Sequence, residues 1–235
     1  MFKCFFALAV LVLSSGAFAQ WTNESELASV QTGGNSQVLT TNAKTTNLYK
    51  WTLNTLKFGG HYTYGETQNG VSARNWDANS RLERQLSEHF AIVGGEIIEG
   101  NRFISIKARY NTDLGAKYYY IKTDAKTLVT ELSLRYTIED RYAPAENTYD
   151  NKARFYNEFS HKVSETVQYK FWLEYVPNFT DSRDYLINGE ASLTSILNST
   201  FSLKVAYLGM YDNQTAVEGF KNYDYTTTTS IVAKF

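Results

Sequence analysis

The chain has 235 residues and a formal net charge of −1, since 23 lysines and arginines nearly balance 24 aspartates and glutamates. Nucleic-acid-binding surfaces need clustered positive charge, so this balance argues against that class of partner. Tyrosine (18) and phenylalanine (14) are abundant, yet the mean hydropathy is only −0.38. An aromatic-rich chain that is polar on average is typical of a barrel with one lipid-facing and one wet face.

Residues 1–19 have the pattern of a cleaved signal peptide. Lys3 supplies the positive charge, residues 5–13 are apolar, and residues 17–19 (Ala-Phe-Ala) form the cleavage site. The apolar stretch is far shorter than the ~20 residues of a membrane-spanning helix. The one cysteine, Cys4, would leave with this peptide. We therefore expect residues 20–235 to form a single domain without a disulfide or a cysteine metal ligand.

Alternation of apolar and polar residues predicts strands throughout the rest of the chain, with no helix between them. In the clearest case, Leu114, Ala116 and Tyr118 alternate with Asp113 and Lys117. Over 90–99 the interpretation places Ala91, Val93, Gly95 and Ile97 outward. The twelve predicted strands cover 21–31, 37–48, 52–66, 71–85, 90–99, 105–121, 127–139, 152–161, 166–176, 185–195, 200–211 and 223–235.

The predicted connections alternate in length. Those after the even-numbered strands are short, whereas residues 140–151, 177–184 and 212–222 form long polar segments. Short periplasmic turns and long external loops are typical of bacterial barrels whose termini are both periplasmic. The sequence therefore predicts an all-β protein, a single antiparallel transmembrane β-barrel of about 12 strands, in the outer membrane of a Gram-negative bacterium.

The last strand has the pattern of an assembly signal. Tyr225, Ile231, Ala233 and the terminal Phe235 share one face of the alternation. Such a closing strand is similar to the segment that the barrel-assembly machinery recognises in outer-membrane barrels. We therefore expect two partners, this machinery during biogenesis and outer-membrane lipid afterwards. The oligomeric state stays open.

Charged residues fall on the predicted inward face of nearly every strand. Acidic and basic side chains are close to balanced there, which favours a lumen filled by paired charges over a wide selective pore. A small polar channel remains open for a barrel of this size. The same inward phase includes Glu96, Glu139, Arg154, Glu158, Lys170, Glu174, Glu190 and Lys204. The candidate lumen charge network is Glu24, Glu26, Lys57, Asp77, Arg81, Glu83, Lys107, Arg109, Asp113, Lys117, Glu131 and Arg135.

Three stretches carry a resemblance to a known family. They are the opening Trp21…Glu26-Leu27…Thr32-Gly33-Gly34-Asn35, the middle stretch 113–118 (Asp-Leu-Gly-Ala-Lys-Tyr) and the aromatic closing strand. Together they resemble the salt-induced outer-membrane protein family, a domain of unknown function. The resemblance implies an outer-membrane barrel tied to osmotic or salt stress, and it implies no catalytic residues.

The expected role is non-enzymatic, either structural or a narrow passive channel for small polar solutes. His61, His89 and His161 are widely separated, so no metal-ligand spacing appears, and we expect no cofactor. One alternative is an outer-membrane barrel hydrolase, which would need a histidine beside a serine or carboxylate. Another is a binding module that acts through the long external loops.

Overall fold

The structure, a computed structural model, describes residues 20–32, 38–214 and 221–235. The predicted signal peptide and the turn Gly33-Gly34-Asn35 lie outside these residues. In the described part, no helix is long and apolar enough to cross a membrane. One 3-10 helix, η1 (Arg102–Ile104), accompanies twelve strands: β1 (Gln20–Thr32), β2 (Val38–Trp51), β3 (Asn54–Thr67), β4 (Gly70–Gln85), β5 (Phe90–Asn101), β6 (Ile106–Lys122), β7 (Lys126–Arg141), β8 (Thr148–Lys162), β9 (Val167–Pro177), β10 (Tyr185–Ile196), β11 (Phe201–Asp212) and β12 (Tyr223–Lys234).

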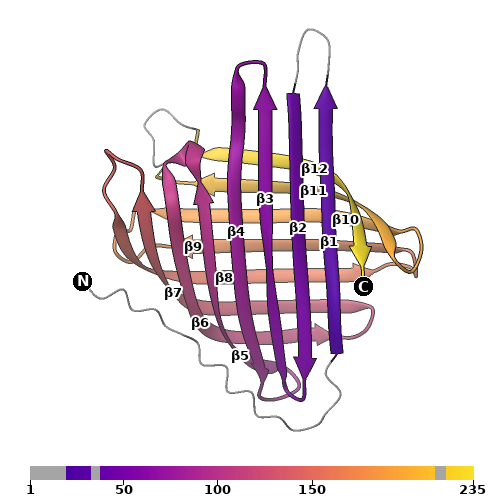
Figure 1. Cartoon of the computed structure of the whole chain (residues 1–235). Helices are drawn as coiled ribbons and strands as arrows, with labels where there is room; N and C mark the ends of the chain where they lie inside the picture. The colour runs from indigo at the N-terminus through magenta and orange to yellow at the C-terminus, as the bar shows by residue number, and fades with distance from the viewer. Residues whose placement is uncertain (1–19, 33–37, 215–220) are drawn as a thin grey trace.

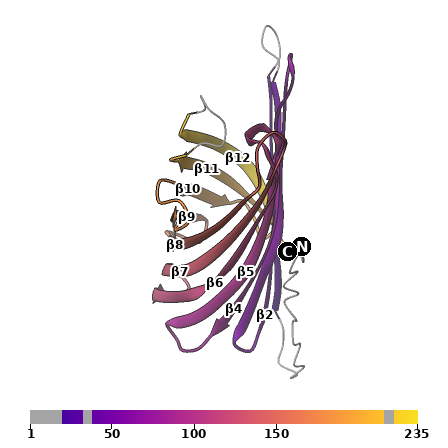
Figure 2. The same cartoon turned by 90° about the vertical axis from the view of Figure 1, so that its left-hand side faces the viewer.

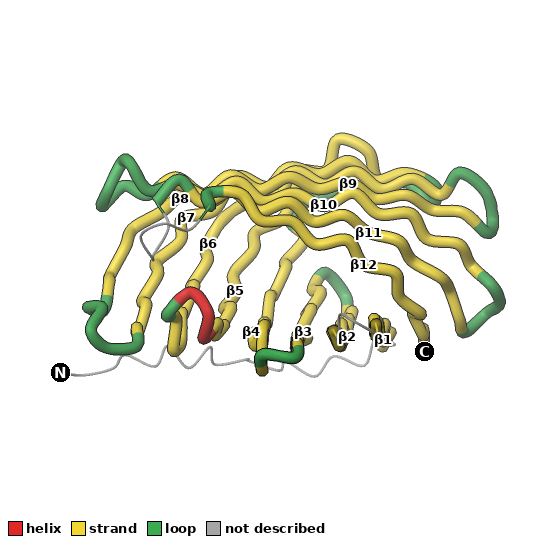
Figure 3. The backbone as a smooth tube through the Cα atoms, turned by 90° about the horizontal axis from the view of Figure 1, so that it is seen from above, coloured by secondary structure: helices red, strands yellow, loops and turns green. Residues whose placement is uncertain are grey.

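Each strand pairs antiparallel with its neighbours in the chain, and β1 pairs with β12 to close the barrel. This closing seam is short, because its register runs only from Glu24 opposite Lys234 to Leu27 opposite Ile231. Figure 1 shows β1–β4 crossing steeply over β8–β12, and Figure 2 shows the strands between them curving around the side. From above, β2–β4 lie in a wall that faces β9–β11 (Figure 3). The predicted all-β antiparallel barrel of about twelve strands is confirmed.

Neighbouring side chains along the strands differ sharply in exposure. In β6, Asp113 is only 3% exposed and Leu114 is 71% exposed; in β7, Leu134 is 69% exposed and Arg135 is 7% exposed. Charged residues are therefore buried inside, while large apolar residues cover the outside. This order is the reverse of a soluble protein and is what a lipid-facing barrel requires.

The two ends of the barrel differ as the sequence predicts. The start of β1, the end of β12 and the short connections, such as Thr52-Leu53 between β2 and β3, lie at one end, here called the turn end. The longer connections after β7, β9 and β11 lie at the other, here called the loop end. Aromatic pairs mark both ends: Trp21 packs on Phe58 at 5.6 Å near the turn end, and Tyr207 stacks on Tyr225 at 5.7 Å near the loop end. These rings occupy the positions of interfacial girdles.

The predicted phase of β5 is wrong. Ala91 and Val93 are buried inside, whereas Phe90 and Ile92 face outward. Glu96 consequently lies on the outer face, where the Thr112 hydroxyl donates a hydrogen bond to it at 2.6 Å. Because residues 90–95 of β5 are apolar or glycine on both faces, the alternation of this strand is ambiguous. The register with the neighbouring strands decides the phase.

Candidate functional site in the barrel interior

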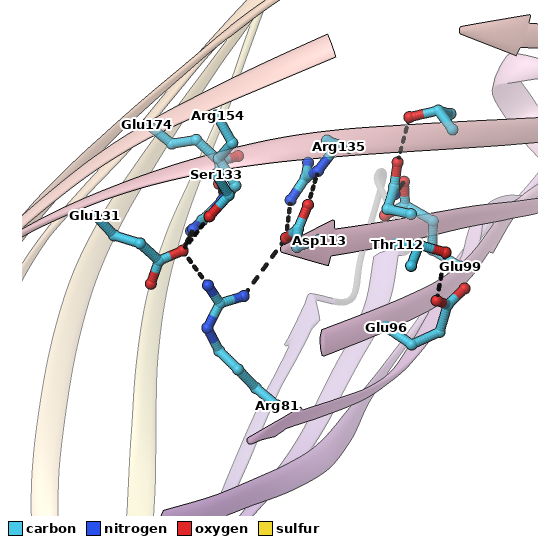
Figure 4. A network of polar contacts seen from close by, with 12 residues as sticks. Arg81, Glu96, Glu99, Thr112, Asp113, Glu131, Ser133, Arg135, Arg154 and Glu174 are labelled. Atoms are coloured by element: carbon cyan, nitrogen blue, oxygen red, sulfur yellow. Dashed lines mark hydrogen bonds and ion pairs between the residues drawn. The ribbon is translucent and has the colours of Figure 1, made fainter. Parts of the chain in front are cut away.

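A cluster of six charged residues crosses the middle of the interior; it is called the central cluster. Arg135 binds Asp113 through two hydrogen bonds of 2.7 and 2.9 Å, a bidentate geometry that is stronger than a single contact. Arg81 approaches the same carboxylate at 3.4 Å. Figure 4 shows these residues converging from different strands. The cluster comprises Arg81, Asp113, Glu131, Arg135, Arg154 and Glu174.

Glu131 is the most connected member of the central cluster. Its carboxylate accepts hydrogen bonds from Arg81 and Arg154, and from the Ser133 hydroxyl at 3.0 Å. Arg154 also binds Glu174. Three guanidinium groups therefore face three carboxylates, so the cluster is neutral as a whole. Pairing of this kind offsets much of the free energy lost when charges leave water.

Two inward-facing glycines give the central cluster its space. Arg81 lies on β4 and its partner Glu131 lies on β7, so the Arg81 side chain must reach across β5 and β6. Gly95 lies opposite both Arg81 and Asp113 in the register. A Cβ atom at Gly95 would come within 2.8 Å of a backbone oxygen, and one at Gly115 within 2.2 Å. Any larger residue there would displace the strands that hold the cluster.

A second charged group lies between the central cluster and the loop end. Arg109 binds Glu99 at 3.0 Å and also binds Glu139, which in turn binds Arg141. Asn111 extends this group, because its amide donates a hydrogen bond to Glu99 at 3.5 Å and accepts one from the Thr137 hydroxyl at 2.9 Å. Glu99 and Arg141 were missed by the sequence prediction. The inward position of Glu99 would have followed from the correct phase of β5.

Two lysine–glutamate pairs lie nearer the turn end. The Lys117 ammonium is 2.6 Å from Glu83, which also accepts a hydrogen bond from the Tyr119 hydroxyl at 2.6 Å. Lys170 lies 2.7 Å from Glu158. A carboxylate in each pair is thus held by a cation, and the wall carries no net charge at these positions.

The seam has its own polar contacts. Glu26 on β1 accepts a hydrogen bond from Ser230 on β12 at 2.7 Å and lies 3.2 Å from the Lys204 ammonium on β11. Lys204 also lies 3.5 Å from Glu190. Glu26 precedes the last paired residue of β1 at the seam, so these contacts hold the barrel closed where its backbone pairing ends.

The four remaining residues of the predicted network differ in their contacts. Two have a charged or ionisable partner: Glu24 lies 3.0 Å from Lys234, and Asp77 lies 3.5 Å from the His61 ring. Lys57 faces the interior but has no ion pair with a described residue. Lys107 is exposed at the loop end and has none either, because a bulge between Ile106 and Ala108 turns Ile106 inward in its place.

The histidine with the most polar surroundings is His61. Its Nε2 atom is 3.0 Å from the Thr63 hydroxyl, and that hydroxyl donates its proton to Asn42 at 2.6 Å. His61 must therefore donate to Thr63, which is the reverse of what a general base does. Among the described residues, no group of three or more histidine, cysteine, aspartate or glutamate side chains could hold a metal ion.

The closed antiparallel strands, the apolar exterior and the charged interior together define a class of protein, the bacterial outer-membrane β-barrels. The family model described as "Protein of unknown function, DUF481" matches residues 25–235, and the chain belongs to this family. No curated protein matches the sequence.

Two solved structures are similar in fold. The NanC porin shares 12% identity with a TM-score of 0.52, over 92% of this chain and 98% of the porin. The COG4313 outer membrane channel from Pseudomonas putida F1 shares 10% identity with a TM-score of 0.55, over 92% of this chain and 95% of the channel. At such low identity the likeness shows the fold alone, and that fold is the outer-membrane barrel.

Proposed function

We propose that this protein is a non-enzymatic barrel of the Gram-negative outer membrane whose interior is a narrow passive channel for small polar solutes. The observation that carries the proposal is the charge-paired interior inside an apolar shell. Charged side chains in a bilayer-spanning protein are unfavourable unless they are paired or in contact with water. An interior lined by them on all sides is suited to water and polar solutes.

The geometry supports a narrow passage. Arg81 reaches across β5 and β6 to Glu131, and Arg154 joins β8 to β7 and β9, so the central cluster occupies part of the cross-section. On the wall formed by β2 and β3, the side chains of Lys44 and Lys57 are exposed. In the proposed channel, the wet path would run between the central cluster and this wall.

Conductance in planar bilayers tests the proposal. Refolded protein covering residues 20–235 is expected to give steady single-channel steps. The variant Arg81→Ala, which removes the side chain that crosses two strands, is expected to give larger steps. Folding of both proteins is checked by circular dichroism in detergent. Folded protein that gives no steps above the background of empty bilayers would reject the channel.

The second candidate is a structural envelope protein with a closed interior. It is favoured by one observation: in the described part of the chain, no buried side-chain nitrogen or oxygen lacks a hydrogen-bond partner. An interior whose buried polar atoms all have hydrogen-bond partners needs no solute to complete it. Absence of conductance together with an outer-membrane location would favour this function over the channel.

A role in salt stress is a further part of the proposal. The resemblance to salt-induced outer-membrane proteins implies that the amount of this protein rises after a shift to high salt. Quantifying the protein in outer-membrane fractions before and after the shift tests both location and inducer. An unchanged amount would remove the salt-stress role and leave the barrel function untouched.

A further inference from the structure

The seam between β1 and β12 is paired through the backbone only near the turn end. Its register ends where Leu27 lies opposite Ile231. Beyond this point β1 continues to Thr32 and pairs with β2 alone, and β12 pairs with β11 alone from Tyr223 to Ser230. Figure 1 shows β12 running away from β1 beyond their short contact. Both strands therefore have an unpaired edge over residues 28–32 and 223–230, here called the open seam.

Unpaired strand edges are unfavourable inside a bilayer, because lipid chains offer the backbone no hydrogen bond. At about 3.3 Å per residue, residues 28–32 of β1 alone span roughly 17 Å, which is a substantial part of a hydrocarbon core ~30 Å thick. Unpaired backbone at this depth is tolerated only where it lines a water-filled cavity or is covered by protein. The open seam therefore either joins the wet interior or is covered by another chain.

The outward side chains along the open seam are polar. Ser29 on β1 and Thr227 and Thr229 on β12 are exposed, and both threonines share the outer face of β12 with Ile231. Elsewhere the outer face carries large apolar residues such as Leu134, which is 69% exposed. The rim of the open seam therefore presents hydroxyl groups where the rest of the wall presents hydrocarbon.

The inner face beside the open seam is apolar. On β11, Ala206, Leu208 and Met210 share the inner face with Lys204, which binds Glu26 across the interior. Met210 is 36% exposed. Residues 206, 208 and 210 are here called the apolar strip, and they lie opposite residues 228, 226 and 224 of the unpaired part of β12. A second copy of the chain docked on the outside would cover the strand edges but would leave the apolar strip in water.

We propose that the open seam is a lateral portal through which the hydrocarbon chain of a membrane phospholipid enters the interior and binds along the apolar strip. Burial of the lipid methylene groups against the strip removes apolar surface from water, which is favourable. The flexible Met210 side chain suits a hydrocarbon chain of variable shape. The hydroxyl groups of Ser29, Thr227 and Thr229 at the rim hydrogen-bond the polar part of the lipid. This portal goes beyond the proposed channel for polar solutes, and its tests do not depend on conductance.

Disulfide cross-linking tests whether the seam is open. Residues 20–235 contain no cysteine, so introduced pairs can be compared directly. Ser25→Cys with Ala233→Cys, a pair that is directly opposite in the paired part of the seam, should cross-link readily on mild oxidation. Ser29→Cys with Thr229→Cys, which would be directly opposite if the register continued, should cross-link severalfold more slowly. Equally complete cross-linking of the two pairs would show a seam paired along its length and would overturn the portal.

Fluorescence quenching tests whether lipid enters. A fluorophore is attached to Leu208→Cys in the apolar strip, and the protein is refolded into vesicles of phosphatidylcholine with brominated acyl chains. Val205→Cys, an outward position on the same strand, measures full contact with lipid. Asn75→Cys, opposite the inward Thr63 on the facing wall, measures the background of the interior (Figure 3). Quenching at position 208 is expected to approach that at 205 and to exceed that at 75 severalfold.

The outcomes separate the portal from the channel. Quenching at position 208 that is no greater than at 75 would overturn the portal, whether or not the protein conducts. Quenching at 208 in folded protein that gives no single-channel steps would support the portal and reject the channel. A dimer cross-linked through Ser29→Cys alone would assign the unpaired edges to a second copy of the chain and would also overturn the portal.

Discussion

Replacing Glu131 by glutamine should destabilise the barrel more than any other neutralisation of a single carboxylate in the described interior. Glu131 is 2% exposed and accepts hydrogen bonds from Arg81, Arg154 and Ser133. The variant keeps the shape of the side chain and removes its charge. Two guanidinium groups then lose a negative partner in a buried environment, although Arg81 keeps Asp113 and Arg154 keeps Glu174.

The magnitude follows from the burial of the pair. Removing one partner of a buried ion pair costs about 3–5 kcal/mol, because the remaining charge is left without compensation. Since both arginines retain a second carboxylate, we expect a value near 3 kcal/mol. The control is Glu24→Gln, which breaks the pair with Lys234 where both side chains are 46% exposed. An exposed pair contributes about 0–1 kcal/mol.

The assay is equilibrium unfolding by guanidinium in lipid vesicles, monitored by tryptophan fluorescence. The free energy of unfolding is obtained by linear extrapolation to zero denaturant. A double variant that also carries Arg154→Gln should be less destabilised than the sum of the two single variants, because the residues share one contact. If Glu131→Gln and Glu24→Gln lowered the free energy of unfolding equally, the idea of a buried, tightly coupled cluster would be refuted.

Three further outcomes are expected. The mature protein should begin at Gln20, which mass spectrometry of outer-membrane protein checks; a mass that includes Cys4 would contradict cleavage. Deleting Phe235 should lower the amount of assembled barrel in outer-membrane fractions, whereas substituting the exposed loop residue Glu146 by glutamine should not. Leu134→Arg, on the lipid-facing surface, should lower the free energy of unfolding by about 2–4 kcal/mol if it lies near the bilayer midplane; an unchanged stability would argue that this face does not contact lipid.

Most of the fold could be predicted from the sequence because the strands carry their orientation in their own alternation. In β6 and β7, single-residue steps from Asp113 to Leu114 and from Leu134 to Arg135 separate buried from exposed side chains. Connection lengths then gave the two ends correctly. The prediction failed in β5, where Ala91, Ile92 and Val93 are all apolar. In such a strand only the pairing with its neighbours determines which face is inward.

The candidate site was less predictable, because pairing inside a barrel is not a property of single strands. The inward positions of Arg81, Asp113 and Glu131 follow from alternation, but their contact does not. Arg81 finds Glu131 three strands away, and that reach depends on Gly95 and Gly115 in the strands between them. Spacing along the chain carries no signal for such a contact.

The same limit explains why a near-equal count of acidic and basic residues does not describe the interior. A balanced total favours mutual pairing only if each charge lies within reach of its opposite. The register places Lys57 against Arg81, and the nearby carboxylates Asp113 and Glu131 are bound to Arg81. Lys57 therefore has no ion pair with a described residue, although acidic and basic side chains nearly balance over the interior. A near-equal count of charges therefore describes the sum over the interior, whereas strand register decides which side chain is left without a partner.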